Sequence, residues 1–208
     1  MQTFLNLDSS DEEIILSSEN DLVIQSLKKR VKYLIIYGSK KSGKTSIANN
    51  FSKVFETNLI NKLPKDLNIN INKETYLDLN NLPAKDENFF HFLQHFISNK
   101  IPLTIFTSDS SIENLSDKIY LPDIESRLRQ FNLCNIQNPS KDLLLKLIKK
   151  YLFLKSITVP EQIIIEVMNH IERTYLAAFE AAKTINHLLY ENNHNINLSL
   201  IRKYYEKL

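Results

Sequence analysis

Apolar residues in the first two thirds of the chain form short runs, and segments with helical spacing separate these runs. The runs have the length and apolar character of buried strands, and the separating segments have the spacing of amphipathic helices. The strand candidates are residues 31–37, 57–61, 74–79, 101–109 and 133–137. The helices expected among them are residues 44–55, 85–100 and 121–131. Because strands that alternate with helices form parallel sheets covered on both faces, we predict an α/β domain.

The pattern changes at Asn138, because the later apolar segments all have helical spacing. Four helices are expected, within residues 138–156, 159–171, 174–191 and 197–207. Typical start signals precede or open three of them, namely Pro139-Ser140, Pro160 and Asn197-Leu198-Ser199. We therefore expect an extended tail at residues 1–10, an α/β domain at 11–138 and a small all-α domain at 139–208.

Composition narrows the class of protein. The 208 residues carry a formal net charge of +2, which does not suggest a dedicated nucleic-acid binder. The single cysteine, Cys134, excludes an internal disulfide and a multi-cysteine metal site. No apolar run reaches the roughly 18 residues that a membrane span needs, and the acidic start does not resemble a signal peptide. We expect a cytoplasmic protein that has no contact with a membrane.

The stretch YGSKKSGKTS, residues 37–46, contains both glycines of the chain. It matches the P-loop pattern G-x-x-x-x-G-K-[ST], and it follows a strand candidate and opens a helix candidate. Glycine allows positive φ angles and a close approach of backbone N–H groups to phosphate. The residues expected to contact a nucleotide are Gly38, Ser39, Lys40, Lys41, Ser42, Gly43, Lys44 and Thr45. The pattern predicts that the chain binds ATP or ADP, with Lys44 near the β- and γ-phosphates and Thr45 on Mg²⁺.

Three other features have weaker chemical interpretations. His91 and His95 lie four residues apart on an expected helix, but HFLQH lacks the glutamate of a zinc motif, so a packing role is favoured. Cys134 is expected to be a buried strand residue rather than a nucleophile. The basic residues 28–32 either end a solvated helix or contact DNA.

Several stretches resemble motifs of the AAA+ ATPases, and within these of the DnaA-related branch and its Hda-type inactivators of DnaA. They are DEEIILSSEND (11–21), FFHFLQ (89–94), TIFTSD (104–109), LPDIESRL (121–128) and ERTYLAAFEAAKTINHL (172–188). The resemblance implies a three-layer αβα sandwich with a parallel sheet, followed by an all-α helical lid. It also implies that Arg127 is an arginine finger acting on a neighbouring subunit's nucleotide. Ser108 and Asp109 are the candidates for one residue that senses the nucleotide, and Arg173 is the candidate for another. The alternatives are an ion pair of Arg127 with Asp123 or Glu125, and a solvated Arg173 at a helix start.

The strand candidate in TYLDLNNL departs from this family, which has two adjacent acidic residues there, one for Mg²⁺ and one that polarises water. Asp78 stands alone between Leu77 and Leu79. One alignment places Leu77 at the first acidic position and Asp78 at the second, and the other places Asp78 first and Leu79 second. A carboxylate is missing in either alignment. We therefore expect nucleotide and Mg²⁺ binding, with weak hydrolysis by this chain.

The opening residues, MQTFLNL, match the Q-x-x-L-x-L type of clamp-binding peptide at Gln2, Leu5 and Leu7. The alternative is an ordinary terminus whose apolar residues pack on the domain. The resemblance implies a regulator in the bacterial cytosol that is tethered to the DNA polymerase sliding clamp and stimulates hydrolysis of DnaA-bound ATP. Its partners would be DnaA, the clamp and clamp-bound DNA, and a homo-oligomer is allowed. A DnaA-lineage DNA-remodelling or loader ATPase and a small P-loop kinase stay open as other classes.

Overall fold

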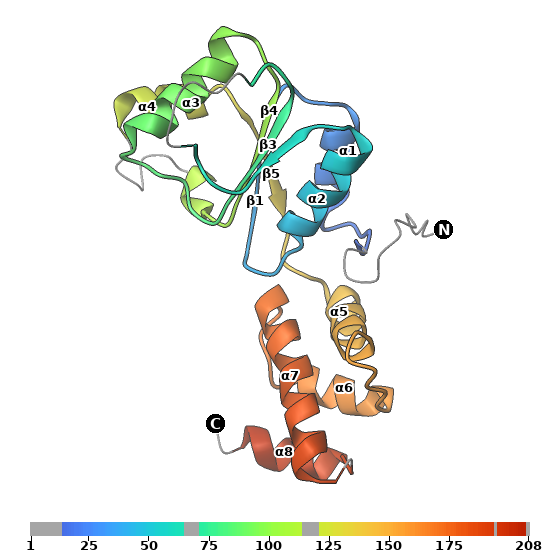
Figure 1. Cartoon of the computed structure of the whole chain (residues 1–208). Helices are drawn as coiled ribbons and strands as arrows, with labels where there is room; N and C mark the ends of the chain where they lie inside the picture. The colour runs from blue at the N-terminus through green and yellow to red at the C-terminus, as the bar shows by residue number, and fades with distance from the viewer. Residues whose placement is uncertain (1–13, 65–70, 114–120, 194, 207–208) are drawn as a thin grey trace. The chain divides into compact units, whose positions relative to one another are not determined.

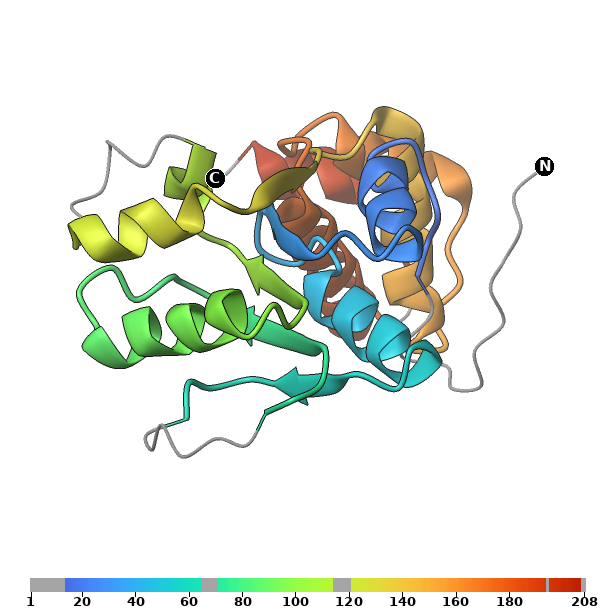
Figure 2. The ribbon, with the colours of Figure 1, turned by 90° about the horizontal axis from the view of Figure 1, so that it is seen from above.

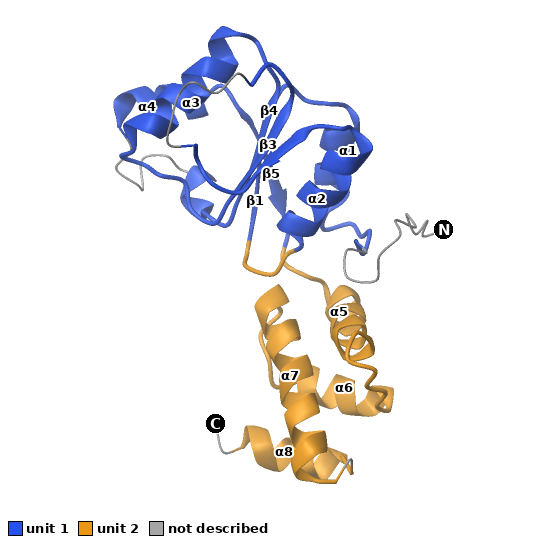
Figure 3. Ribbon diagram, viewed as in Figure 1, with its two compact units in different colours: residues 1–38, 43–137 blue, residues 39–42, 138–208 orange. Residues whose placement is uncertain are grey.

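The chain forms two compact units (Figure 3). The structure is a computed structural model, and it describes residues 14–64, 71–113, 121–193 and 195–206. The first unit comprises Met1–Gly38 and Gly43–Gln137, and the second comprises Ser39–Ser42 and Asn138–Leu208. Buried apolar residues occur throughout both units.

A parallel five-stranded sheet forms the centre of the first unit (Figure 1). Its strands are β1 (Tyr33–Gly38), β2 (Asn58–Ile60), β3 (Thr75–Leu79), β4 (Leu103–Thr107) and β5 (Asn132–Ile136). They lie in the order β2-β3-β4-β1-β5, so the first strand of the chain sits between the last two. Every strand candidate in the sequence forms a strand, with each end within two residues of the expected position. The predicted α/β fold class is confirmed.

Helices cover both faces of this sheet. They are α1 (Asp21–Lys28), α2 (Lys44–Val54), α3 (Glu87–Ser98) and α4 (Pro122–Leu128), with a short 3₁₀ helix, η1 (Ser110–Glu113), after β4. α1 and α2 lie on one face, and α3 and α4 lie on the other (Figures 1 and 2). Apolar side chains of α3 and α4 form a core with the sheet, and they include Phe89, Phe92, Leu93, Phe96, Ile124 and Leu128. The sequence prediction contains the three later helices but not η1.

Four helices form the second unit together with Ser39–Ser42. They are α5 (Lys141–Phe153), α6 (Glu161–Met168), α7 (Tyr175–Glu191) and α8 (Leu198–Tyr205), as the apolar spacing predicts. Side-chain oxygens cap three of them: Ser140 accepts from the N–H of Leu143 at 3.3 Å, Thr174 from Ala177 at 3.0 Å and Asn197 from Leu200 at 2.9 Å. These bonds satisfy N–H groups that a helix start leaves without a partner. No helix in the described part of the chain is long and apolar enough to cross a membrane.

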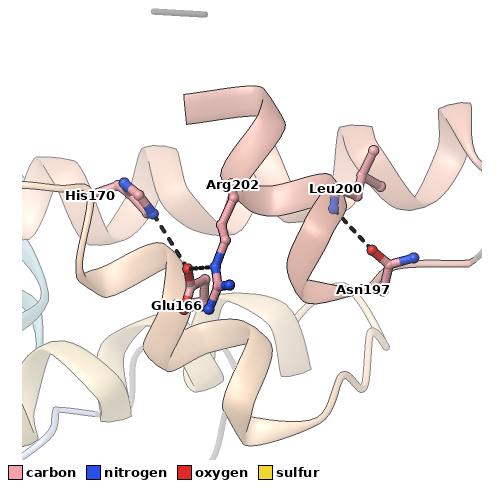
Figure 4. A network of polar contacts seen from close by, with 5 residues as sticks. All are labelled: Glu166, His170, Asn197, Leu200 and Arg202. Atoms are coloured by element: carbon pink, nitrogen blue, oxygen red, sulfur yellow. Dashed lines mark hydrogen bonds and ion pairs between the residues drawn. The ribbon is translucent and has the colours of Figure 1, made fainter. Parts of the chain in front are cut away.

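A polar network joins α6 to α8 (Figure 4). The Glu166 carboxylate accepts two hydrogen bonds from Arg202, at 2.6 and 3.4 Å, and His170 Nε2 lies 3.6 Å from the same carboxylate. The hydrogen bond from Arg202 lowers the pKa of Glu166. The His170 ring stacks on Tyr205 with ring centroids 5.0 Å apart. The network supplements the small apolar contact of the last helix, in which Ile201 is the one described residue that is buried.

Candidate functional site

The P-loop leaves the sheet at the end of β1, with Gly38 as the last strand residue. Gly43 directly precedes α2 and has a φ of 88°, in the left-handed region that glycine adopts at little cost. Gly38 is not among the residues with positive φ, whereas Lys41 has a φ of 67°. Backbone conformation therefore requires glycine at only one of the two expected positions.

Lys44 is the first residue of α2, and its side chain turns back toward the strand. Its Nζ donates to the carbonyl oxygen of Gly38 at 2.8 Å, and the residue is only 7% exposed. Burial lowers the pKa of Lys44 to about 8, although the charge of Asp78 opposes this shift. The ammonium group is thus held between the two ends of the P-loop, which is where the sequence pattern expects a phosphate.

Thr45 and Asp78 come together from α2 and β3. The Thr45 hydroxyl donates to Asp78 Oδ2 at 2.6 Å. Since side chains alternate along a strand, Leu77 and Leu79 point to the other face, where Leu77 belongs to the α3 core and Leu79 packs against it. The hydrogen bond between Thr45 and Asp78 favours the alignment that places Asp78 at the first acidic position and Leu79 at the second.

The pair fits a magnesium site of the type completed by a nucleotide. Hydroxyl and carboxylate oxygens are ligands that Mg²⁺ prefers, and proteins often hold this ion with few side chains plus substrate phosphates. Among the described residues, no group of three or more histidine, cysteine, aspartate or glutamate side chains is arranged to hold a metal by itself. Thr45 and Asp78 would therefore need phosphate oxygens to complete the coordination of Mg²⁺.

Asp109 follows β4, which pairs with β3 in the sheet. It is 9% exposed, and its carboxylate accepts from Leu82 N at 3.4 Å and from Ser111 N and Oγ at 3.2 and 2.6 Å. These bonds tie the loop after β3 to η1. The residue expected to sense a nucleotide thus also organises the loops at this edge of the sheet.

Arg127 lies in the last turn of α4 and contacts α3. Its Nε donates to Gln94 Oε1 at 2.7 Å, and its guanidinium carbon lies 5.3 Å from the centroid of the Phe90 ring. Glu125, one of the two alternative partners, instead pairs with Arg129, which donates to it from Nε at 3.1 Å, and the described part of the chain has no ion pair between Arg127 and Asp123. Sequence reasoning missed Gln94, although its spacing of four residues from Phe90 in FFHFLQ places both on one helix face.

Arg173 is exposed and lies in the turn before α7, since Thr174 caps that helix. The resemblance implies that Arg173 belongs to this helix, but α7 begins two residues after it, at Tyr175. Gln2, Leu5 and Leu7 lie outside the described residues, so the proposed clamp-binding peptide has no structural description.

The weaker features have structural contacts. His95 Nε2 lies 3.0 Å from the carbonyl oxygen of Ile71, which agrees with a packing role. Cys134 is buried, with its sulfur 3.3 Å from Ser26 Oγ. Arg30, within the basic stretch, pairs with Glu74 and lies over the Phe55 ring.

The sheet order, the P-loop between β1 and α2, and the following helical unit define the P-loop AAA+ fold. Domain III of the replication initiation protein DnaA from Thermotoga maritima is similar, with a TM-score of 0.69 and 15% identity over 96% of each chain. The RuvB Holliday junction branch migration motor of Thermotoga maritima has a TM-score of 0.67 and 16% identity, covering 93% of this chain and 70% of RuvB. AMPPCP-bound DnaA from Aquifex aeolicus has a TM-score of 0.60 and 19% identity, covering 92% and 68%. No protein-family model and no curated protein matches the sequence.

Proposed function

We propose that this chain is a nucleotide-binding AAA+ regulator of replication initiation. Tethered to the sliding clamp, it would stimulate hydrolysis of ATP bound to DnaA. The observation that carries the nucleotide-binding part is the P-loop geometry, with Gly43 in the left-handed region, Lys44 between the loop ends and Thr45 on Asp78. The regulatory part rests on the resemblance of LPDIESRL and MQTFLNL to Hda-type motifs.

Within the nucleotide site, each residue has a separate task. Backbone N–H groups of the P-loop and the start of α2 would bind the phosphates, and protonated Lys44 would neutralise their charge. Thr45 and Asp78 would hold Mg²⁺, which neutralises phosphate charge when it is bound. Leu79 provides no carboxylate that could orient or deprotonate water. The chain would thus retain nucleotide, as ADP or ATP, and turn it over slowly.

Arg127 is the residue that would act on the partner's ATP. A guanidinium beside the γ-phosphate stabilises charge on the transferred oxygens and contributes about 10³- to 10⁵-fold in rate. The Arg127 Nε donates to Gln94, and one terminal nitrogen lies 3.4 Å from Ser126 Oγ, which is a long contact. This arrangement suits an arginine finger that contacts the nucleotide of a second protein.

Hydrolysis of ATP pre-bound to DnaA tests the proposal. Reactions contain this chain and DNA-loaded clamp, and compare the wild type with Arg127→Ala and Gln2→Ala. We expect the wild type to accelerate phosphate release and both variants to lose the acceleration. Arg129→Ala is the matched control, because Arg129 follows Arg127 by two residues but pairs with Glu125.

The outcomes separate the function classes. Acceleration that persists in Arg127→Ala would exclude a finger mechanism, and acceleration without the clamp would exclude tethering. A loader or remodelling ATPase would instead hydrolyse its own ATP on DNA when DnaA is absent. That result would overturn the proposed regulation while leaving nucleotide binding in place.

A further inference from the structure

We infer that the exposed face of α5 around Phe153 binds single-stranded DNA. Phe153 is the last residue of α5, and 79% of it is exposed. Single exposed apolar residues are common and need no explanation by themselves. The residues that surround this ring give it a chemical context.

Lysines dominate the segment that carries the ring. Residues 141–155 contain five lysines and one aspartate, so this helix is more positive than the whole chain, whose net charge is +2. Lys149 and Lys146 precede Phe153 by four and seven residues, which places all three on one face of the helix. Lys149 pairs with Glu161, but within the described residues Lys146 has no ion pair.

The spacing allows one nucleic-acid strand to contact both the lysine ammonium groups and the Phe153 ring. At about 1.5 Å per residue, Lys149 and Lys146 lie roughly 6 and 10 Å from Phe153 along the helix axis. Lys155 is exposed in the turn after the helix, two residues beyond Phe153. A backbone that follows this face would meet cations on both sides of an aromatic platform.

This composition distinguishes nucleic acid from a protein partner. Lysine is depleted in the cores of protein interfaces, whereas lysine with a stacking aromatic side chain is typical of single-strand binding. A duplex hides the faces of its bases, so only an unpaired base can stack on Phe153. The commitment to DNA rather than RNA rests on the proposed function, because a DNA-loaded clamp would bring this surface to DNA.

Fluorescence anisotropy with a labelled oligothymidine of about twelve nucleotides tests the inference on the full chain. Excess ADP and Mg²⁺ keep the P-loop occupied. We expect Phe153→Ala to weaken binding about tenfold and Phe153→Tyr to retain it, since stacking contributes about 5- to 150-fold per base. Lys146→Ala should lower the slope of log affinity against log salt by about 0.7, the value for one phosphate contact on a single strand.

Matched controls come from the same unit. Tyr190→Ala removes an aromatic ring that is 83% exposed, but it lies beside Glu191, and Lys183, seven residues before it, pairs with Glu180. Lys203→Ala removes an exposed lysine of α8. Neither change should alter the affinity for the oligonucleotide.

Unchanged affinity in Phe153→Ala would overturn the inference, as would tighter binding of the matching duplex or RNA. If Phe153→Ala instead weakens binding to DnaA or the clamp and leaves DNA binding intact, the surface is a protein interface. Because the oligonucleotide assay contains neither DnaA nor clamp, its failure is distinct from failure of the proposed regulation.

Discussion

Gly43 allows a test of whether backbone conformation alone fixes a residue of the P-loop. Gly43 directly precedes α2 and has a φ of 88°. A methyl group added at its Cα would meet no other heavy atom within 4 Å. Gly43→Ala should therefore create no clash. The expected cost is that of holding an L-residue in the left-handed region, about 1–2 kcal/mol.

Urea unfolding without nucleotide measures this cost as a change in the free energy of unfolding. We expect Gly43→Ala to lose about 1–2 kcal/mol, or roughly 2–8 °C in melting temperature for a chain of this size. Gly43→Asn should lose less, since asparagine adopts left-handed conformations more readily, and β-branched Gly43→Val should lose more. A loss above about 3 kcal/mol in the alanine variant would reveal a steric requirement and refute the reasoning. Equal losses in the asparagine and alanine variants would also refute it.

Three further predictions concern single residues. Burial lowers the pKa of Lys44 to about 8, and bound phosphate would raise it, so ADP affinity should fall as the pH rises above about 8. Calorimetric titration measures this, with Lys44→Arg as the non-titrating control; a flat wild-type profile would contradict the lowered pKa. Leu79→Glu should raise the chain's own phosphate release by about 10²-fold if an acid is what hydrolysis lacks, and equal rates in Leu79→Gln would show otherwise. Asn197→Ala should cost about 1 kcal/mol in urea unfolding by removing the cap of α8, whereas Asn197→Asp should not.

Local features of the fold could be predicted from the sequence because their causes are local. Buried strands appear as apolar runs, and Ser140 and Asn197 mark helix starts by the hydrogen bonds that they accept. The expected helix at 85–100 begins instead at Glu87, because the Asp86 side chain accepts from Asn88 N at 2.8 Å and caps it there. Such end effects depend on single bonds that a periodicity does not contain.

Contacts between distant segments could not be predicted in the same way. The sequence left two alignments of Asp78 open, and its hydrogen bond from Thr45, 33 residues earlier, could not be read from the sequence. Arg127 had two acidic neighbours on its own helix, but its guanidinium bonds to Gln94 on another. The strand order likewise depends on packing across the whole unit.

Cys134 gives the protein a built-in reporter of local opening. It is the chain's only cysteine, and its buried sulfur lies beside Ser26 where α1 packs on the edge strand β5. An alkylating reagent reaches this buried sulfur after a local opening such as separation of α1 from β5, so the labelling rate in native buffer reports on such openings. A second cysteine placed on an exposed position would react far faster and could carry a dye without removing the natural thiol. The same protein can thus carry a dye at a chosen cysteine while the labelling rate of Cys134 measures local opening beside β5.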